Sequence, residues 1–190
     1  MTAPDPAVEA QWLHRAQHAR DHRAFAELVN LHQGRVRAVL RKLTHGQHAL
    51  ADELAQECFL KAWQSLPAFR AEARLSTWLH RIAYLEFLQH QRRGQLDASS
   101  PVYSSGMDSA LTLATDHALR LDVEKSLALL SPLECAAIVH CYHADLSHTE
   151  AAQVMGIPLG TLKSHVSRGR EKLRHLLSAW QPTPSRKEGP

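Results

Sequence analysis

Hydroxyl-bearing and basic side chains are concentrated between residues 158 and 173, in the stretch PLGTLKSHVSRGREKL. With helical spacing, its apolar residues fall on one narrow stripe and the polar side chains lie outside. Hydroxyls and cations bond phosphate oxygens, and lysine or arginine also reaches guanine edges. The stretch is therefore a candidate DNA-binding helix, although many basic helix faces are only solvated. The candidate contact residues are Thr161, Lys163, Ser164, His165, Ser167 and Arg168.

The residues before this helix predict a shorter helix and a tight turn. Ser147 and Glu150 have the spacing of a capping box, in which each side chain bonds a free backbone N–H of the first turn. Gly156 suits the end of the short helix because glycine adopts a left-handed conformation without strain. Pro158 suits the first turn of the next helix, where its missing N–H costs nothing. This order predicts a helix-turn-helix whose second helix enters the major groove of DNA.

Histidines and cysteines raise the separate possibility of a metal site. On a helix, the neighbours His140 and Cys141 point about 100° apart, and no second ligand pair follows at zinc-finger spacing. The sequence also has no glycine-rich phosphate loop, nucleophile elbow or carboxylate pair in an apolar setting. We therefore expect no metal, no cofactor and no catalytic residue. The side chains concerned are Cys135, His140, Cys141, His143 and His148.

Composition limits the class of protein without identifying it. The 190 residues have a net charge of +3 that is unevenly distributed: residues 20–94 hold twelve basic and seven acidic residues, whereas residues 95–115 hold two aspartates and no basic residue. No apolar run approaches a membrane span, and the start MTAPDPAVEAQW lacks the apolar stretch of a signal peptide. We therefore expect a cytoplasmic protein without membrane insertion, whose three cysteines are reduced.

The chain divides into two helical blocks separated by a polar segment. Apolar residues follow helical spacing through residues 25–43 and through ALADELAQECFLKAWQSL and TWLHRIAYLEFLQHQRR. Small and turn-forming residues in GQLDASSPVYSSGMDSA predict a flexible linker that lets the blocks move independently. The predicted fold is all-α, with one domain over 20–93, the linker over 94–114, and a second domain over 115–179 that contains the helix-turn-helix.

Three stretches, taken in order, resemble a known family. The sequences DHRAFAELVNLH, ADELAQECFLKAWQSLPAFRAEARLSTWLHRIA and LSPLECAAIV…LSHTEAAQVMGIPLGTLKSHVSRGREKL are similar to a bacterial RNA polymerase sigma factor of the sigma-70 superfamily. The short form, with only the second and fourth conserved regions, resembles the extracytoplasmic-function (ECF) group. This resemblance implies a protein that binds core RNA polymerase and directs it to promoters, with no catalysis of its own.

The resemblance implies a role for each block. In the family, the helix that holds DELAQE docks on a coiled coil of the polymerase β′ subunit, which implies such contacts for Glu53, Gln56 and Glu57. The second block reads the minus-thirty-five promoter element through the helix-turn-helix and is expected to meet the β flap. An anti-sigma factor is a further partner that is common in the group. Candidate contacts to the opened minus-ten strand, where a flipped base is captured, are Arg70, Arg74 and Arg81.

This chain departs from the common family pattern at several promoter-reading positions. Tyr84 and Leu85 follow RIA, where many members have Arg-Asn, and Gln89 stands where an aspartate is usual. His165 takes the place of a common arginine in the recognition helix. The family pattern therefore does not define the promoter bases. A stand-alone helix-turn-helix regulator is the alternative function, and the expected polymerase-docking helix distinguishes the two.

Overall fold

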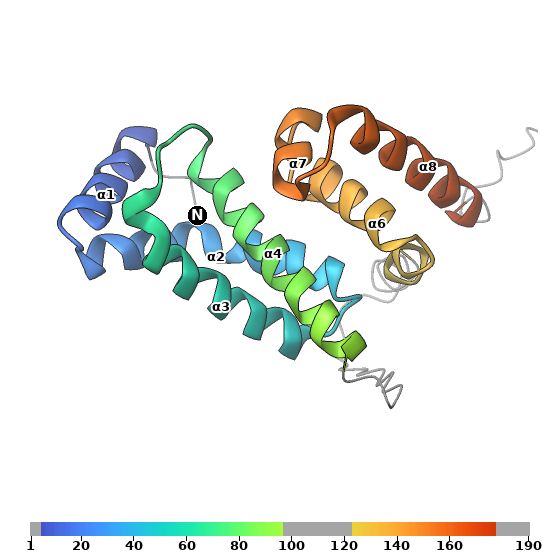
Figure 1. The fold of residues 1–190 in the computed structure, drawn as a ribbon, viewed down its shortest axis with the longest axis horizontal. Coiled ribbons are helices and arrows are strands. Elements are labelled where there is room, and N and C mark those ends of the chain that lie inside the picture. Colours follow the sequence, from blue (N-terminus) through green and yellow to red (C-terminus); the bar gives the residue numbers. More distant parts are fainter. Residues whose placement is uncertain (1–4, 97–122, 178–190) are drawn as a thin grey trace, which may run out of the picture.

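The computed structural model describes residues 5–96 and 123–177, and every regular element in these residues is helical (Figure 1). The all-α prediction is therefore confirmed. Most of the predicted linker lies outside the described residues, but its first residues, 94–96, continue a helix. Below, the N-terminal block means residues 5–96 and the C-terminal block means residues 123–177.

The N-terminal block is built around a long amphipathic helix. Asp21 caps this helix by accepting hydrogen bonds from the backbone N–H groups of Arg23 and Ala24. Its apolar side chains recur every three or four residues, so one face is buried against the other helices of the block, as the sequence predicts. The elements of this block are α1 (Pro6–His18), α2 (His22–Leu43), α3 (His48–Ser65), the short 3-10 helix η1 (Leu66–Ala68) and α4 (Leu75–Leu96).

Helix α1 is not among the elements predicted from the sequence. Asp5 accepts a hydrogen bond from the N–H of Ala7, and Pro6 occupies the first helical position, so the start signals were present in the sequence. The helix packs on α2, where the Nε2 of His32 lies 3.1 Å from a Glu9 carboxylate oxygen. Burial lowers the pKa of His32, and the charge of Glu9 opposes that shift. Its tertiary partner, rather than a strong apolar stripe, therefore holds α1 in place.

The C-terminal block contains the predicted helix-turn-helix. Both members of the Ser147–Glu150 capping box make their backbone hydrogen bonds, and Gly156 ends the first helix with φ = 66°. Pro158 lies just before the second helix and not within its first turn, with its carbonyl accepting from the N–H of Leu162 at 3.0 Å. Residues 123–128 are also helical. The other elements are α6 (Pro132–Ile138), the π-helical turn η2 (Val139–His143), α7 (His148–Met155) and α8 (Leu159–Leu177).

Helices α6 and α8 pack closely along the predicted apolar stripe of α8. Leu162, Val166 and Gly169 are buried, and a Cβ added at Gly169 would lie 2.9 Å from the Cγ1 of Ile138. Glycine at this position therefore permits the close approach of α6. Leu176, near the C-terminal end of α8, is 40 % exposed because α8 extends beyond the much shorter α6.

A carboxylate joins α6 to α8. Glu134 completes the capping box of Ser131 and accepts a hydrogen bond from the Nζ of Lys172 at 2.7 Å. The hydrogen bond from Lys172 is the main cause that lowers the pKa of Glu134. Because the folded state prefers the ionised form, this stabilisation is present above the unfolded pKa of about 4.3 and is lost as the pH falls through the lowered folded pKa.

We expect Glu134→Gln to lower the free energy of unfolding of the C-terminal block by about 1–2 kcal/mol at pH 7. Urea unfolding of the full chain at pH 7 and at pH 3 measures this difference, which should shrink at the lower pH because Glu134 is then increasingly protonated in the parent. Glu171→Gln is the matched control, since Glu171 pairs with Arg174 on an exposed part of α8. An equal loss for Glu134→Gln at both pH values would contradict the ionic role.

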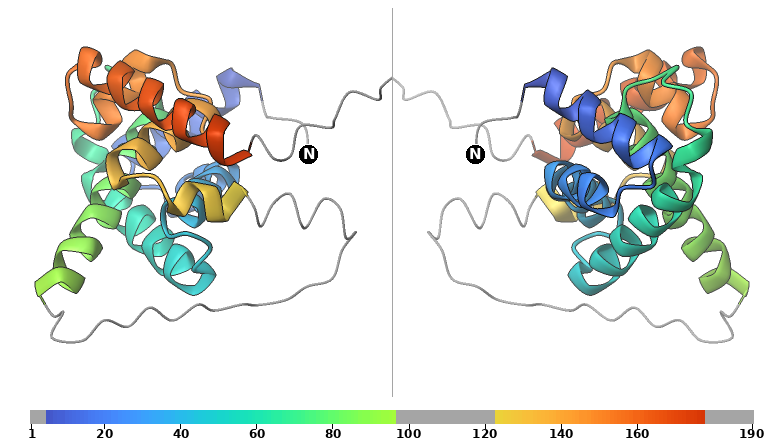
Figure 2. Two further views of the ribbon diagram at one scale, coloured as in Figure 1. Left: turned by 90° about the vertical axis from the view of Figure 1, so that its right-hand side faces the viewer. Right: turned by 90° about the vertical axis from the view of Figure 1, so that its left-hand side faces the viewer.

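The two blocks are packed against each other. Helix α4 lies between α3 on one side and α7 on the other, and α2 contacts η2 (Figure 1). Helix α8 faces outward on the side opposite α1, as the two side views show (Figure 2). The sequence predicts blocks that move independently, whereas in this structure buried side chains join them.

Candidate functional site

The expected polymerase-contact residues form one exposed polar face of α3. Glu53, Gln56 and Glu57 are all exposed and make no hydrogen bond or ion pair to any described residue. The adjacent Asp52 points toward α2 instead, where its carboxylate lies 3.5 Å from the Nε of Arg37. The opposite side of α3 is buried in the core. The face therefore offers two carboxylates and an amide to a partner with cationic or hydrogen-bonding groups.

The three arginines expected at the minus-ten strand occupy different surroundings. Arg70 and Arg74 are exposed in the loop between η1 and α4, in which Ala71 has a positive φ of 55°. Arg81, in the second turn of α4, donates a hydrogen bond from its guanidinium to the backbone carbonyl of Gln153 in α7. In this arrangement, Arg81 is held by the C-terminal block and is not free for DNA.

A second polar contact lies beside Arg81. The hydroxyl of Thr77, which is buried, donates to a carboxylate oxygen of Glu150 at 3.3 Å. The pKa of Glu150 is lowered, first by the hydrogen bonds from Ser147 and to a smaller degree by Thr77 and the charge of Arg74. Thus Arg74 and Arg81, which were predicted to contact single-stranded DNA, both lie near the helix-turn-helix of the same molecule.

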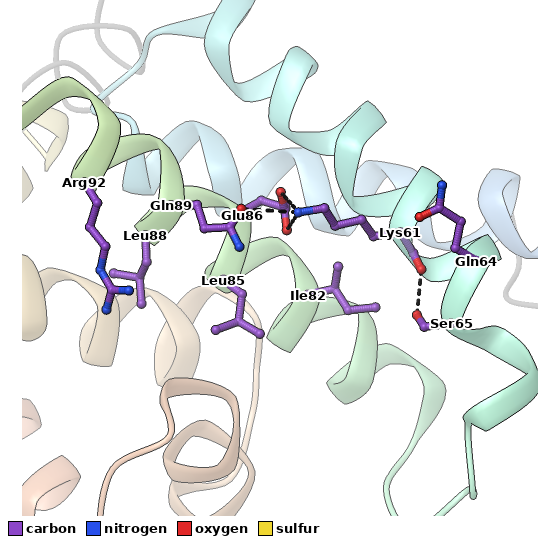
Figure 3. A pocket seen from close by; sticks show the side chains of 9 residues that line it. All are labelled: Lys61, Gln64, Ser65, Ile82, Leu85, Glu86, Leu88, Gln89 and Arg92. Atoms are coloured by element: carbon purple, nitrogen blue, oxygen red, sulfur yellow. Dashed lines mark hydrogen bonds and ion pairs between the residues drawn. The ribbon is translucent and has the colours of Figure 1, made fainter. Parts of the chain in front are cut away.

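A surface groove lies between the end of α3 and α4, beside Leu85 and Gln89 (Figure 3). Its volume is about 560 Å³, and Leu85 is 43 % exposed beside it. At one wall, the Nζ of Lys61 lies 2.7 Å from both carboxylate oxygens of Glu86 and 3.3 Å from the Oε1 of Gln89. Lys61 thus forms an ion pair between α3 and α4. The groove is lined by Lys61, Gln64, Ser65, Ile82, Leu85, Glu86, Leu88, Gln89 and Arg92.

Tyr84 and Leu85, two of the departures from the family pattern, face different ways. Tyr84 is buried and packs edge-on against His140 of the C-terminal block, with ring centroids 5.3 Å apart. Leu85 instead places an apolar side chain at the groove, where an asparagine would offer hydrogen bonds (Figure 3). The two substitutions therefore change two different surfaces: the contact between the blocks and the groove.

The expected DNA-contact residues of α8 lie along its outward side. Thr161, Lys163, Ser164, Ser167 and Arg168 are exposed, and His165 is half-buried. The hydroxyl of Ser164 donates to the carbonyl of Gly160 at 3.0 Å, which still leaves its lone pairs available. Lys163 has no ion pair to another described residue, so its charge is available to a phosphate.

Arg168 is partly held by its neighbours. Its guanidinium lies 3.2 Å from the Nδ1 of His165, and its Nε lies 3.9 Å from a carboxylate oxygen of Glu134. The attraction between Arg168 and Glu134 is weak, because the arginine side chain is 61 % exposed to solvent. The contacts orient Arg168 and His165 together on one edge of the helix.

The histidines and cysteines of residues 135–148 do not converge. Within the described residues, no three histidine, cysteine, aspartate or glutamate side chains are placed to share a metal ion. His140 is fully buried against α4, whereas His143 and His148 are exposed. Burial raises the pKa of the Cys135 thiol to about 11, so this cysteine is protonated at neutral pH.

The residues that join the two blocks were not predicted from the sequence. Glu150 and Gln153 were assigned only to the first helix of the helix-turn-helix, but they also bond Thr77 and Arg81. Lys42 likewise forms an ion pair of 2.9 Å with Glu124. No local sequence signal pointed to these contacts, because their partners lie 72 to 82 positions apart in the chain.

Two family models match the chain, one in each block. The Sigma-70 region 2 model matches residues 28–96, and the Sigma-70 region 4 model matches residues 120–173. The first range includes the exposed face of α3 and the groove, and the second includes the helix-turn-helix. The two regions occur in the order that the sequence resemblance predicts.

Relatives along the full length agree with the family models. The chain is 28 % identical over 170 residues to the ECF RNA polymerase sigma factor SigW of Bacillus subtilis, covering 83 % of this chain and 90 % of that protein. It is 30 % identical over 159 residues to the ECF RNA polymerase sigma factor SigM of Mycobacterium tuberculosis, covering 84 % of this chain and 80 % of the relative.

A solved structure has the same fold. The sigma factor RpoE of Bartonella quintana, determined in complex with the anti-sigma factor NepR, is 30 % identical with a TM-score of 0.71, and the match covers 83 % of this chain and 98 % of that one. The similarity thus extends over both blocks and not only over the helix-turn-helix. The chain therefore belongs to the ECF group of the sigma-70 family of RNA polymerase sigma factors.

Proposed function

We propose that the two blocks divide the work of promoter recognition. The domain over 20–93 binds core RNA polymerase and the minus-ten element, and the domain over 115–179 binds the minus-thirty-five element. The segment over 94–114 links them. The observation that carries this proposal is the presence of both sigma regions, in order, in one chain. A stand-alone regulator needs only the second of them.

The polymerase contact is assigned to α3. Glu53, Gln56 and Glu57 are exposed, unpaired within the described residues, and carried by a helix whose other face is fixed in the core. An acidic and amide face of this kind fits basic and polar groups on a coiled coil of the β′ subunit. The second block supplies the expected contact to the β flap, which brings both DNA-binding surfaces onto the enzyme.

The DNA contacts are assigned to two sets of residues. Arg70, Arg74 and Arg81 provide cations for the opened minus-ten strand, and Arg81 must first leave Gln153. The recognition helix α8 enters the major groove. Its hydroxyl groups contact phosphates, and its basic side chains contact phosphates or base edges. Its contact residues are Thr161, Lys163, Ser164, His165, Ser167 and Arg168.

Further partners and the location follow from the same assignment. The solved relative from Bartonella quintana is bound to an anti-sigma factor, which supports a partner of this class here. None of the helices in the described residues is both long and apolar enough to cross a membrane. We place the protein in the cytoplasm, where core polymerase and promoter DNA are found, and assign it no catalytic step, metal or cofactor.

A reconstitution experiment tests the proposed function. Purified chain is added to core RNA polymerase from the source bacterium, the assembly is isolated, and transcripts are mapped genome-wide in vitro. Specific starts that appear only when the chain is present are the expected result. If the chain binds DNA sites tightly without polymerase and does not co-purify with the core enzyme, the stand-alone regulator is the correct function.

A further inference from the structure

A pair of buried histidines lies where the two blocks meet. His140, in the π-helical turn η2, is fully buried, and neither of its ring nitrogens has a hydrogen-bond partner among the described residues. His80 of α4 is 2 % exposed, and its Nδ1 is also unpartnered. The two rings lie 6.3 Å apart between centroids, and Tyr84 packs against His140. Two groups that bind protons near neutral pH are thus enclosed by the contact between the blocks.

The surroundings of the pair favour the uncharged imidazoles. Burial lowers the pKa of His80 to about 4 and that of His140 to about 3. Nearby basic groups, among them Arg35, lower the pKa of His80 further, and a proton on His80 would do the same to His140. A cavity of about 360 Å³ beside His80 is also lined by the carboxylates Asp145 and Glu150, and Glu150 is already bonded to Ser147 and Thr77. The other titratable or charged groups that face the pair are His32 and Arg35 of α2, Cys135 of α6, His143 of η2, and Arg74, which precedes α4.

The contact between the two blocks also holds Arg81, which is assigned to DNA binding. Arg81 donates to the Gln153 carbonyl, and Thr77 to the Glu150 carboxylate, so α7 covers this side of α4. Promoter binding through both blocks at once requires the minus-ten side of α4 to be accessible. A change that separates the blocks therefore increases the fraction of molecules in which Arg81 is free.

We propose that His140 and His80 form an acid-sensitive latch, whose protonation separates the C-terminal block from α4 in the free protein. The packed state encloses the ring of His140 and the Nδ1 of His80, for which no described residue supplies a hydrogen-bond acceptor. Separation returns both rings to water, where each binds a proton readily. This inference concerns the free chain, and only its consequence for Arg81 rests on the proposed function.

The direction of the pH effect follows from linkage. In the packed state both histidines stay neutral down to acidic pH, whereas in the separated state their pKa is about 6.5. The packed state is therefore fully favoured above about pH 6.5 and loses stability as the pH falls below it. Between pH 7.5 and pH 5.5, each histidine shifts the ratio of separated to packed molecules by about tenfold, and the pair by about a hundredfold.

Energy transfer between two fluorophores measures this ratio in the full chain. Cysteines introduced at the exposed positions Glu27 in α2 and Arg170 in α8 carry the dyes, in a background with Cys141→Ser. Cys58 and Cys135 are buried, with thiol pKa values raised to about 12 and about 11, and do not compete for the label. Circular dichroism at both pH values shows whether the helices stay folded.

The variants then identify the groups responsible. His140→Leu removes a proton-binding ring without breaking a hydrogen bond and should reduce the pH response from about a hundredfold to about tenfold. His80→Leu is the second variant, and His90→Leu, at an exposed position of the same helix, should respond as the parent does. A parent that is separated at pH 7.5 overturns the proposal. So do an unchanged transfer efficiency at pH 5.5 and a pH response that both leucine variants retain.

Discussion

Replacing Lys163 and Arg168 together by alanine should weaken promoter binding by the assembled polymerase at least tenfold. Both side chains are exposed on the outward side of α8, and Lys163 has no ion pair within the described residues. A lost phosphate contact lowers the slope of log affinity against log salt by about one, and a lost bidentate base contact costs roughly 1–3 kcal/mol. Binding measured over a series of salt concentrations separates the two kinds of contact.

Arg174→Ala is the matched control for this prediction. Arg174 is an exposed cation of the same helix, but it lies near the C-terminal end and pairs with Glu171 at 2.7 Å. Its loss should change promoter affinity little, while the assembly with core polymerase should stay intact in both variants. If the Lys163/Arg168 double variant binds promoters as tightly as Arg174→Ala does, α8 is not the DNA-reading helix.

The double substitution Glu53→Ala with Gln56→Ala should weaken assembly with core polymerase by tenfold or more. These residues share the exposed face of α3, where their side chains form no hydrogen bond or ion pair with any described residue. Removing a charge that is desolvated and paired across an interface costs about 2–5 kcal/mol, mostly through faster dissociation. Surface plasmon resonance on immobilised core enzyme measures the dissociation rate directly.

The control for this double variant is Glu27→Ala, an exposed acid of α2 that lies in the same block. The fold should be unaffected in either case, because the buried side of α3 is unchanged and Asp52 keeps its arginine partners. Circular dichroism and a thermal melt establish this before binding is measured. Full transcription by the Glu53/Gln56 variant would show that polymerase docks elsewhere on the chain.

Local sequence signals determined the helices and their ends. Ser147, Glu150 and Gly156 act on backbone groups within one or two turns, so their roles follow from spacing alone, and the structure confirms them. The apolar stripe of α2 is equally local because helical geometry maps spacing directly onto a face. The exposed positions of Glu53, Gln56 and Glu57 follow from the same rule.

Elements with weak local sequence signals were harder to predict from the sequence. Helix α1 has a cap and a proline at its start, but only one of its residues, Ala16, is fully buried, so its sequence lacks a strong apolar stripe. Its position depends on α2 and on the His32–Glu9 contact, which joins residues 23 positions apart. A short amphipathic segment of this kind is stabilised by packing more than by its own propensity.

The tertiary structure alone decided how the two blocks meet. Arg81 and Gln153 are 72 positions apart, and Thr77 and Glu150 are 73 apart, so no spacing rule connects them. His140 illustrates the reason: its sequence context is compatible with a metal ligand, a surface side chain or a core residue. Its burial depends on Tyr84 and His80 approaching from another helix. The sequence by itself therefore determined which helices form and which faces are polar, while the packing of α4 on α7 determined which of those polar groups are free to bind a partner.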